Sequence, residues 1–285
     1  MAAEVNRVGR RLPPLMFVKA TVARVLLLFF LGALKVQAVD IIAHRGASHD
    51  APENTMAAFK LGWQQGADAV ELDVHLTRDG RLAVIHDDNT KRVAGLGKKV
   101  AEQTLAELRA LDAGKWKGKE WIGEKIPALD EVLTAIPAGK RLVIEVKEGP
   151  EAVPPLSDAF KRSGRKPSEI VIIGFSFETM KAARKEFPDT PVYWLAGFDA
   201  RKQAAGEEPT LEELIRKAVD ARFDGLNLSY KWPINGPFAK KVKDAGLELY
   251  VWTVDDLALT KELAAAGVDG ITTNRPGWLR QKLAE

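Results

Sequence analysis

Short apolar runs rich in β-branched residues alternate with longer stretches of helical periodicity from residue 40 onward. A short apolar run is typical of a buried strand, and a period of about 3.6 residues is typical of an amphipathic helix. The pattern predicts eight strands, at 40–44, 69–76, 141–147, 170–175, 192–196, 225–229, 248–253 and 270–273. Helices are expected between them, among others at 54–65, 129–136, 177–186, 211–219, 235–244 and 256–265.

Two of these helices carry start signals in the sequence. Asn54 stands directly before the apolar face of the first helix, so we expect it to begin that helix. Thr210 and Glu213 have the spacing of a capping box, in which each residue satisfies a backbone N–H of the other. The sequence therefore predicts a helix boundary at each place.

The alternation of strands and helices predicts an α/β fold, because strands joined by helices pair in parallel through right-handed crossovers. Eight repeats in about 250 residues match a closed (β/α)8 TIM barrel. An open doubly wound sheet is the alternative, but no G-x-G-x-x-G motif follows the first strand.

One part of the chain departs from the repeat. Residues 82–86 predict an extra short strand, and 88–127 are rich in glycine and lysine. We expect a small insertion here, after strand 2, on the side of the barrel where the loops from strand to helix lie.

The first 38 residues differ from the rest of the chain. The apolar run at 25–34 is shorter than the roughly 20 residues of a spanning helix, but it has the length of a signal-peptide core. Small residues follow it up to Ala38. We expect a signal peptide at 1–38, a mature domain at 39–285, and export to the periplasm or the extracellular space. An uncleaved N-terminal anchor is the alternative; after cleavage no stable membrane span is expected.

The charge distribution argues against a nucleic-acid partner. The chain has 42 basic and 39 acidic residues, but six basic residues and one acidic residue lie in 1–38. The remainder has 36 basic and 38 acidic residues, a net charge of −2, so it lacks the basic surface that nucleic acids require. The chain has no cysteine, which excludes disulfides, a thiol nucleophile and thiolate metal sites.

All four histidines of the chain, His44, His49, His75 and His86, fall within 43 residues of one another. His44 ends strand 1, and His86 ends the extra strand after strand 2. Because the carboxyl ends of barrel strands form the active-site face, both imidazoles are expected at one cavity. They would suit general acid–base catalysis; the alternative is that they are ordinary polar residues at strand ends.

Strand 2 carries charge where a barrel strand should be apolar. Glu71, Asp73 and His75 alternate with apolar residues and so share one face. Two buried carboxylates would repel each other unless a cation neutralises them, and oxygen ligands favour Mg²⁺ or Ca²⁺. The alternative is a half-solvated antiparallel strand.

Strand 3 repeats this pattern with Glu145 and Lys147. Glu145 is expected to complete the metal site, and Lys147 and Arg45 to supply positive charge for an anion such as phosphate. The alternative is that the cations only form ion pairs, Arg45 with Glu53 and Lys147 with Glu145.

Seven ordered motifs carry a family resemblance. They are His44-Arg45-Gly46, Pro52-Glu53-Asn54-Thr55, Glu71-Leu72-Asp73-Val74-His75, His86-Asp87, Glu145-Val146-Lys147, Trp252-Thr253-Val254-Asp255 and Thr273-Asn274-Arg275-Pro276. With them the chain resembles the glycerophosphodiester phosphodiesterase family over essentially all of 39–285. The family often has Asp where this chain has Asn274, and we expect this to be a tolerated variation outside the catalytic set.

The resemblance implies a (β/α)8 barrel that hydrolyses glycerophosphodiesters to sn-glycerol 3-phosphate and an alcohol with one divalent cation, Ca²⁺ or Mg²⁺. It implies that His44 and His86 are the acid–base pair. It also implies three metal ligands, Glu71, Asp73 and Glu145.

Four further residues acquire substrate-binding roles from the resemblance. Arg45 and Lys147 would hold the phosphate, and Glu53 would orient Arg45 or the glycerol hydroxyls. Trp252 would form the wall beside the glycerol or the alcohol; an ordinary core aromatic is the alternative. The nucleophile is left open between water and the substrate's glycerol 2-hydroxyl.

Two other functions are alternatives. A related lysophospholipase D or phospholipase C-like barrel enzyme would act on lipids, and an amphipathic insertion would favour it. The insertion holds Lys98, Lys99, Lys115, Lys117 and Lys119 around Trp116 and Trp121. A noncatalytic protein that binds a phosphate ligand should lack an acid–base pair, and this chain has both candidates. The expected partner is a small molecule; the sequence predicts no oligomeric state.

Overall fold

The computed structural model describes residues 1–4 and 39–285. The predicted signal peptide therefore lies outside the described residues, except for its first four. In the part that is described, no helix has both the length and the apolar character needed to cross a membrane.

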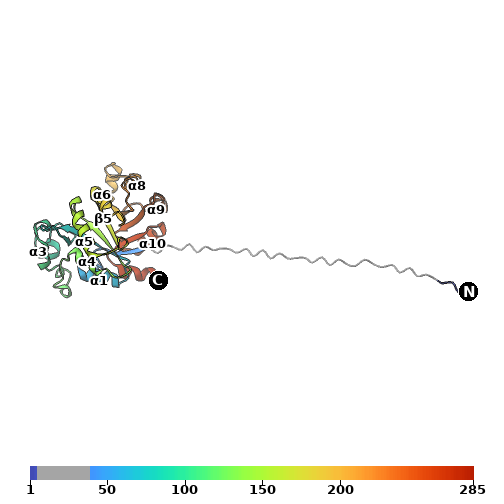
Figure 1. Cartoon of the computed structure of the whole chain (residues 1–285), viewed down its shortest axis with the longest axis horizontal. Helices are drawn as coiled ribbons and strands as arrows, with labels where there is room; N and C mark the ends of the chain where they lie inside the picture. The colour runs from blue at the N-terminus through green and yellow to red at the C-terminus, as the bar shows by residue number, and fades with distance from the viewer. Residues whose placement is uncertain (5–38) are drawn as a thin grey trace. The chain divides into compact units, whose positions relative to one another are not determined.

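Eight parallel strands close into a barrel (Figure 1). They are β1 (Asp40–Ala43), β2 (Ala69–Leu76), β4 (Arg141–Val146), β5 (Ile170–Gly174), β6 (Val192–Ala196), β7 (Gly225–Ser229), β8 (Glu248–Trp252) and β9 (Gly270–Thr273). The order β1-β9-β8-β7-β6-β5-β4-β2 is closed by pairing of β1 with β2. The predicted (β/α)8 barrel and all eight of its strands are confirmed.

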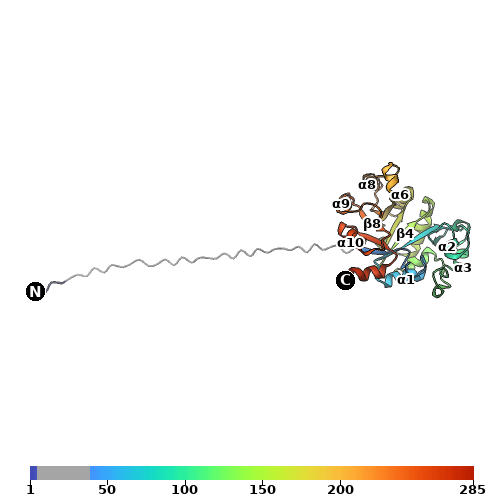
Figure 2. The same ribbon diagram turned by 180° about the vertical axis from the view of Figure 1, so that it is seen from behind.

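Among the residues that the structure describes, nine helices connect or cover the strands of the barrel. They are α1 (Met56–Gln64), α4 (Leu129–Ala135), α5 (Val153–Ser163), α6 (Phe177–Glu186), α7 (Ala200–Ala204), α8 (Leu211–Asp220), α9 (Gly236–Asp244), α10 (Leu257–Ala266) and α11 (Pro276–Ala284). Seen from opposite sides, Figures 1 and 2 show them arranged around the strands. The six predicted helices are present. α5 was not predicted and starts with Val153-Pro154-Pro155, because proline in a first turn loses no hydrogen bond.

The two faces of the strands have different surroundings. On β2, Val70, Leu72 and Val74 pack outward into the large cluster under the helices. The intervening side chains, Glu71 and Asp73 among them, therefore face the barrel interior. A smaller apolar cluster fills the interior with residues such as Val143, Ile173, Tyr193 and Tyr250. The charged residues are thus buried by strand alternation.

The predicted start of the first helix is wrong by one residue. Thr55 caps α1, and its hydroxyl accepts a hydrogen bond from the Ala58 N–H at 3.3 Å. Asn54 instead adopts a positive φ of 57° and turns its side chain inward. Its Nδ2 donates to Asp73 Oδ2 at 2.8 Å, so a residue expected to cap the helix supports a buried carboxylate.

The segment after β2 forms a small subassembly beside the barrel. β3 (Leu82–Val84) pairs antiparallel with β2 and ends two residues earlier than predicted. Next come α2 (Lys91–Ala94), η1 (Val100–Glu102), α3 (Leu105–Ala110) and η2 (Lys119–Trp121). Their apolar side chains form a separate cluster that includes Val93, Leu105 and Leu108; Figure 2 shows α2 and α3 beside each other.

Candidate active site

A cavity of about 210 Å³ opens where the strands end. Its lining residues are His44, Arg45, Glu71, His86, Glu145, Lys147, Ile173, Phe175, Asn227, Trp252, Thr253 and Thr272. Seven of the nine predicted site residues are among them. The other two, Glu53 and Asp73, lie directly behind the lining and contact Arg45. The structure therefore brings all nine predicted residues to one place.

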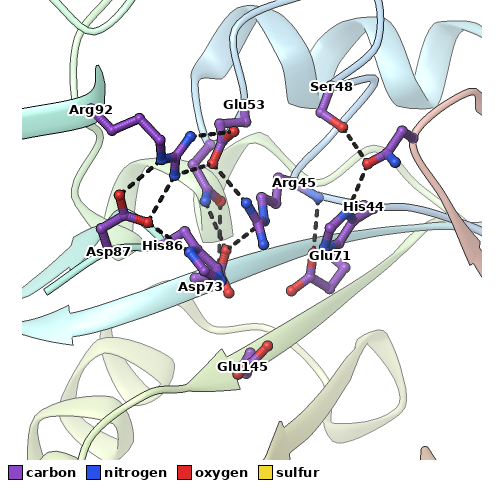
Figure 3. A network of polar contacts seen from close by, with 12 residues as sticks. His44, Arg45, Ser48, Glu53, Glu71, Asp73, His86, Asp87, Arg92 and Glu145 are labelled. Carbon is purple, nitrogen blue, oxygen red and sulfur yellow. Dashed lines mark hydrogen bonds and ion pairs between the residues drawn. The ribbon is translucent and has the colours of Figure 1, made fainter. Parts of the chain in front are cut away.

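Three carboxylates gather in the wall of this cavity. Asp73 on β2 lies opposite Glu145 on β4 in the parallel register, and Glu71 is two residues before Asp73. One oxygen of each carboxylate lies within 4.8 Å of the others. Figure 3 shows Glu71, Asp73 and Glu145 with the polar network around them. The alternative of a half-solvated strand is wrong, because Asp73 is fully buried.

The protonation of these carboxyl groups reflects their crowding. Burial and the charges of Asp73 and Glu145 raise the pKa of Glu71 well above its usual range. Burial and Asp73 raise the pKa of Glu145 to about 7. Although burial acts in the opposite direction, Lys147 and Arg45 lower the pKa of Asp73 to about 2. A cation at this position would favour the ionised form of all three.

The donor set fits a hard divalent cation. Carboxylate oxygens are the ligands that Mg²⁺ and Ca²⁺ prefer. Asp73 Oδ1 is buried, and its contact with Lys147 Nζ at 3.2 Å is an ion pair without hydrogen-bond geometry. This oxygen therefore keeps lone pairs that can bind a further positive group. Glu71, Asp73 and Glu145 could therefore hold a metal ion together.

Arg45 is positioned by an unusual turn after β1. Its φ is +54°, and the φ of the next residue, Gly46, is +81°. Any side chain at position 46 would clash, because its Cβ would lie 2.5 Å from the Ala58 backbone. The backbone N–H of Arg45 donates to Glu71 Oε2 at 2.8 Å. Its side chain bonds to Glu53 at 2.9 Å and lies 3.3 Å from Asp73.

Lys147 approaches the same carboxylates from the end of β4. Its Nζ lies 2.7 Å from Glu145 Oε1 and 3.2 Å from Asp73 Oδ1. The ion pairs that the sequence offered as an alternative, Arg45–Glu53 and Lys147–Glu145, are thus both present. Both cations also line the cavity, so pairing and anion binding are compatible.

His44 is held by a neutral partner. Asn274 donates from its side-chain Nδ2 to Asp255 at 2.6 Å, which turns its Oδ1 toward His44 Nδ1 at 2.7 Å. His44 Nδ1 must therefore be the donor, and Nε2 carries a free lone pair. Burial and the adjacent Arg45 lower the pKa of His44 to about 4. Asn274, for which we expected a tolerated variation outside the catalytic set, thus contacts a predicted catalytic histidine.

His86 is held by a charged partner instead. Its Nδ1 lies 2.8 Å from Asp87 Oδ1. Arg92 bonds to Asp87 and holds the pKa of that carboxyl well below its usual range. Burial lowers the pKa of His86, and the charge of Asp73 opposes this shift. The two imidazoles therefore differ in electrostatic setting.

The other two histidines do not line the cavity. His75 Nε2 lies 3.0 Å from the His86 backbone carbonyl, and its Nδ1 lies 2.6 Å from Glu148. It therefore supports the backbone beneath His86. His49 is exposed and contacts Asp50. Of the four histidines that cluster in the sequence, two, His44 and His86, line the cavity.

An aromatic wall faces the charged groups. The indole N–H of Trp252 donates to the Asn227 carbonyl at 3.1 Å, and Phe175 packs edge-to-face on Trp252 at 5.7 Å. The sequence predictions missed Phe175 and Asn227. Asn227 interrupts the apolar run of β7, and a buried polar residue there is a signal that could have revealed it.

This combination of fold and site defines a (β/α)8-barrel hydrolase of phosphoric diesters. Three carboxylates, the charged side chains of Arg45 and Lys147, and two imidazoles surround one cavity at the end of the strands. The model of the glycerophosphoryl diester phosphodiesterase family matches residues 44–278. The chain belongs to this family, as its sequence motifs predicted.

Relatives of known name cover most of the chain. YhdW of Bacillus subtilis is 35% identical over 84% of this chain and 96% of its own length. A glycerophosphodiester phosphodiesterase of Caldanaerobacter subterraneus is 34% identical over 83% of this chain and 94% of its own. A phosphodiesterase of Oleispira antarctica, solved with the product sn-glycerol-3-phosphate, has a TM-score of 0.77 and 26% identity. That similarity covers 86% of this chain and 97% of the Oleispira chain.

Proposed function

We propose that this protein hydrolyses glycerophosphodiesters to sn-glycerol 3-phosphate and an alcohol, with a divalent cation and two histidines. One observation carries the proposal: two imidazoles with unlike partners line the same cavity as Arg45, Lys147 and the carboxylate cluster. The product bound by the Oleispira antarctica enzyme supports a substrate of this class.

The cation would be held by Glu71, Asp73 and Glu145. Their oxygens favour Ca²⁺ or Mg²⁺ over softer ions. A cation bound there would supply positive charge that neutralises the phosphate oxygens. Arg45 and Lys147 would bind the same phosphate, because both are charged and line the cavity. Glu53 would keep Arg45 in place through the hydrogen bond at 2.9 Å.

The two histidines would divide the proton transfers. His44 is neutral with a free Nε2, so it is assigned as the base that takes a proton from the nucleophile. His86 is assigned as the acid that protonates the departing alkoxide, because the Asp87 carboxylate stabilises its protonated form. The nucleophile is water or the glycerol 2-hydroxyl. Detection of a cyclic phosphate during turnover would identify the hydroxyl.

A substrate screen tests the proposed activity. Purified protein would be assayed with glycerophosphocholine, glycerophosphoethanolamine and a lysophospholipid, each with and without Ca²⁺ or Mg²⁺. We expect release of sn-glycerol 3-phosphate from the first two substrates. Hydrolysis of only the lysophospholipid would support a lipid phosphodiesterase instead, and binding without hydrolysis would support a noncatalytic protein.

Asn227 is expected to bind a hydroxyl group of the substrate. It is 2% exposed and lines the cavity, and its Oδ1 has no hydrogen-bond partner within the described residues. A buried unpaired polar atom costs about 1–3 kcal/mol, and a substrate hydroxyl would satisfy it. The variant Asn227→Leu should therefore raise KM for glycerophosphocholine about 10-fold. Steady-state kinetics would measure this change.

The control for Asn227 is a substrate without a hydroxyl group. Bis(p-nitrophenyl) phosphate offers the phosphodiester but no hydroxyl, so its KM should stay within about 2-fold of the wild-type value in Asn227→Leu. Equal increases for both substrates would contradict hydroxyl recognition and indicate a general distortion of the cavity.

We also propose that the protein is exported. The proposal depends only on the sequence of 1–38, which has the composition of a signal peptide. N-terminal sequencing of the secreted protein should start at or near Val39. Recovery of the intact N-terminus on a cytoplasmic protein would contradict export, and an intact N-terminus in the membrane fraction would indicate an anchor.

A further inference from the structure

Arg92 on α2 binds two carboxylates with one guanidinium group. Its Nε and Nη2 donate to Asp87 at 2.8 and 2.9 Å. Its Nη1 and Nη2 donate to Glu53 at 2.8 and 2.9 Å. Figure 3 shows Arg92 next to both carboxylates, away from the Glu71 side of the site. Arg92 thereby joins the loop that follows β1 to the loop that follows β3.

Each of these carboxylates contacts a residue that lines the cavity. Asp87 Oδ1 lies 2.8 Å from His86 Nδ1, and Glu53 Oε1 accepts from Arg45 Nη1 at 2.9 Å. A continuous polar chain therefore runs from His86 to Arg45 through Arg92. In Figure 3, His44 and His86 lie on opposite sides of Arg45, so this chain approaches the site from the His86 side.

The contacts of Arg92 need the shape of arginine as well as its charge. A guanidinium presents five donors in a rigid plane and can hold two carboxylates at once, whereas an ammonium is a single point charge. An isolated exposed ion pair contributes little to stability. Here the carboxylates are largely shielded, with side-chain exposures of 12% for Glu53 and 27% for Asp87, and four hydrogen bonds act together.

The inserted segment fixes Arg92 in turn. Val93, the next residue, is 6% exposed and belongs to the separate apolar cluster of this segment. No residue of 88–127 is among those that line the cavity. The segment therefore contacts residues behind the cavity lining, through Arg92 at Glu53 and Asp87 and through Lys117, whose Nζ donates to the Ser48 carbonyl at 2.7 Å.

We propose that Arg92 is a positioning residue that orients His86 through Asp87 and links it to Arg45 through Glu53. The inference rests on the role proposed above for His86. The inserted segment would then contribute to catalysis, because it holds the His86 imidazole in the orientation that directs Nε2 at the substrate.

The two branches of this chain differ in how much they depend on Arg92. Arg45 has another anchor in Asp73, at 3.3 Å. Asp87 has side-chain hydrogen bonds only to His86 and Arg92 among the residues the structure describes. Removal of Arg92 should therefore release His86 more than Arg45. The main effect is expected on kcat, with a smaller effect on KM.

The test compares Arg92→Ala, Arg92→Lys and a control, Arg109→Ala. Arg109 is also an arginine of the segment, with a similar side-chain exposure of 46% against 41% for Arg92, but it pairs with Glu131 outside the site. Arg92→Ala should lower kcat for glycerophosphocholine about 10-fold to 100-fold, the range typical of residues that orient a site ligand. Arg92→Lys should recover only part of the loss, and Arg109→Ala should stay near wild type.

A second substrate separates positioning from a general structural effect. The p-nitrophenyl ester of glycerol 3-phosphate has a leaving group that departs without a proton. Arg92→Ala should be nearly as active as wild type on this ester. A similar loss of kcat on both substrates, or a loss in Arg109→Ala equal to that in Arg92→Ala, would overturn the inference.

A double-mutant cycle keeps the inference distinct from the proposed function. In the His86→Ala background, Arg92→Ala should reduce kcat for glycerophosphocholine by less than about 2-fold, because its target is already absent. A full additional 10-fold loss would show that Arg92 does not act through His86. His86→Ala alone, compared on the two substrates, tests the acid role itself. One outcome is that the p-nitrophenyl ester fails to rescue His86→Ala while the effects of Arg92→Ala and His86→Ala on kcat remain non-additive. In that case the proposed acid role of His86 is wrong, but Arg92 still acts through His86.

Discussion

Removal of divalent cations with EDTA should abolish hydrolysis of glycerophosphocholine, and addition of Ca²⁺ or Mg²⁺ should restore it. The expected loss is about 10³-fold or more, because a cation contributes several kcal/mol to stabilising a phosphoryl transition state. The reason lies in the carboxylates of Glu71, Asp73 and Glu145, whose oxygens lie within 4.8 Å of one another. Activity assays after chelation and metal analysis of the protein would measure the effect.

The variant Asp73→Ala should lose metal affinity, because it removes the central oxygen donors. Calorimetric titration with Ca²⁺ should detect binding to the wild-type protein and none to the variant. A ligand that binds only the native state raises the melting temperature, so Ca²⁺ should stabilise the wild type but not Asp73→Ala. Asp158→Asn, an exposed residue of α5, is the matched control and should behave as wild type. Full activity in a chelator, with metal verified absent, would refute the metal assignment.

Replacement of either cavity histidine should lower kcat by about 10²-fold to 10⁴-fold, the usual contribution of general acid–base catalysis. His44→Ala and His86→Ala should both show this loss on glycerophosphocholine. The p-nitrophenyl ester of glycerol 3-phosphate should largely rescue His86→Ala, because its leaving group needs no proton. It should not rescue His44→Ala, since the nucleophile still has to lose its proton. Steady-state kinetics of both variants on both substrates would measure this difference.

Two further variants serve as comparisons for the histidines. His49→Ala changes an exposed histidine that does not line the cavity, so it should retain wild-type kcat. Lys147→Ala should raise KM and lower kcat on both substrates, because it removes a charge that binds phosphate in the ground state and the transition state. Equal losses of His44→Ala and His86→Ala on both substrates would contradict the division into base and acid.

The local pattern predicted the barrel well for a physical reason. Each strand is buried on both faces, so runs such as 170–175 are apolar throughout and stand out from the amphipathic helices between them. Charged residues in such a run are costly to bury, and this cost identified Glu71, Asp73 and Glu145 as site residues. Helix starts were harder to predict, because Asn54 and Thr55 can both cap a helix and only the fold turns Asn54 toward Asp73.

The sequence alone therefore determined the alternation of strands and helices and the family motifs, from which the nine site residues followed. These features depend on residues that are close together in the chain, where periodicity and burial cost act directly. The tertiary structure decided which partners those residues contact. Asn274 bonds to His44, which is 230 residues away in the chain, and Arg92 bonds to Glu53, which is 39 residues away. Such pairs form only when the barrel closes and the inserted segment packs against it, so no local pattern distinguishes them. The neutral partner of His44 follows from such a distant contact, whereas the charged partner of His86 is its neighbour in the sequence, Asp87.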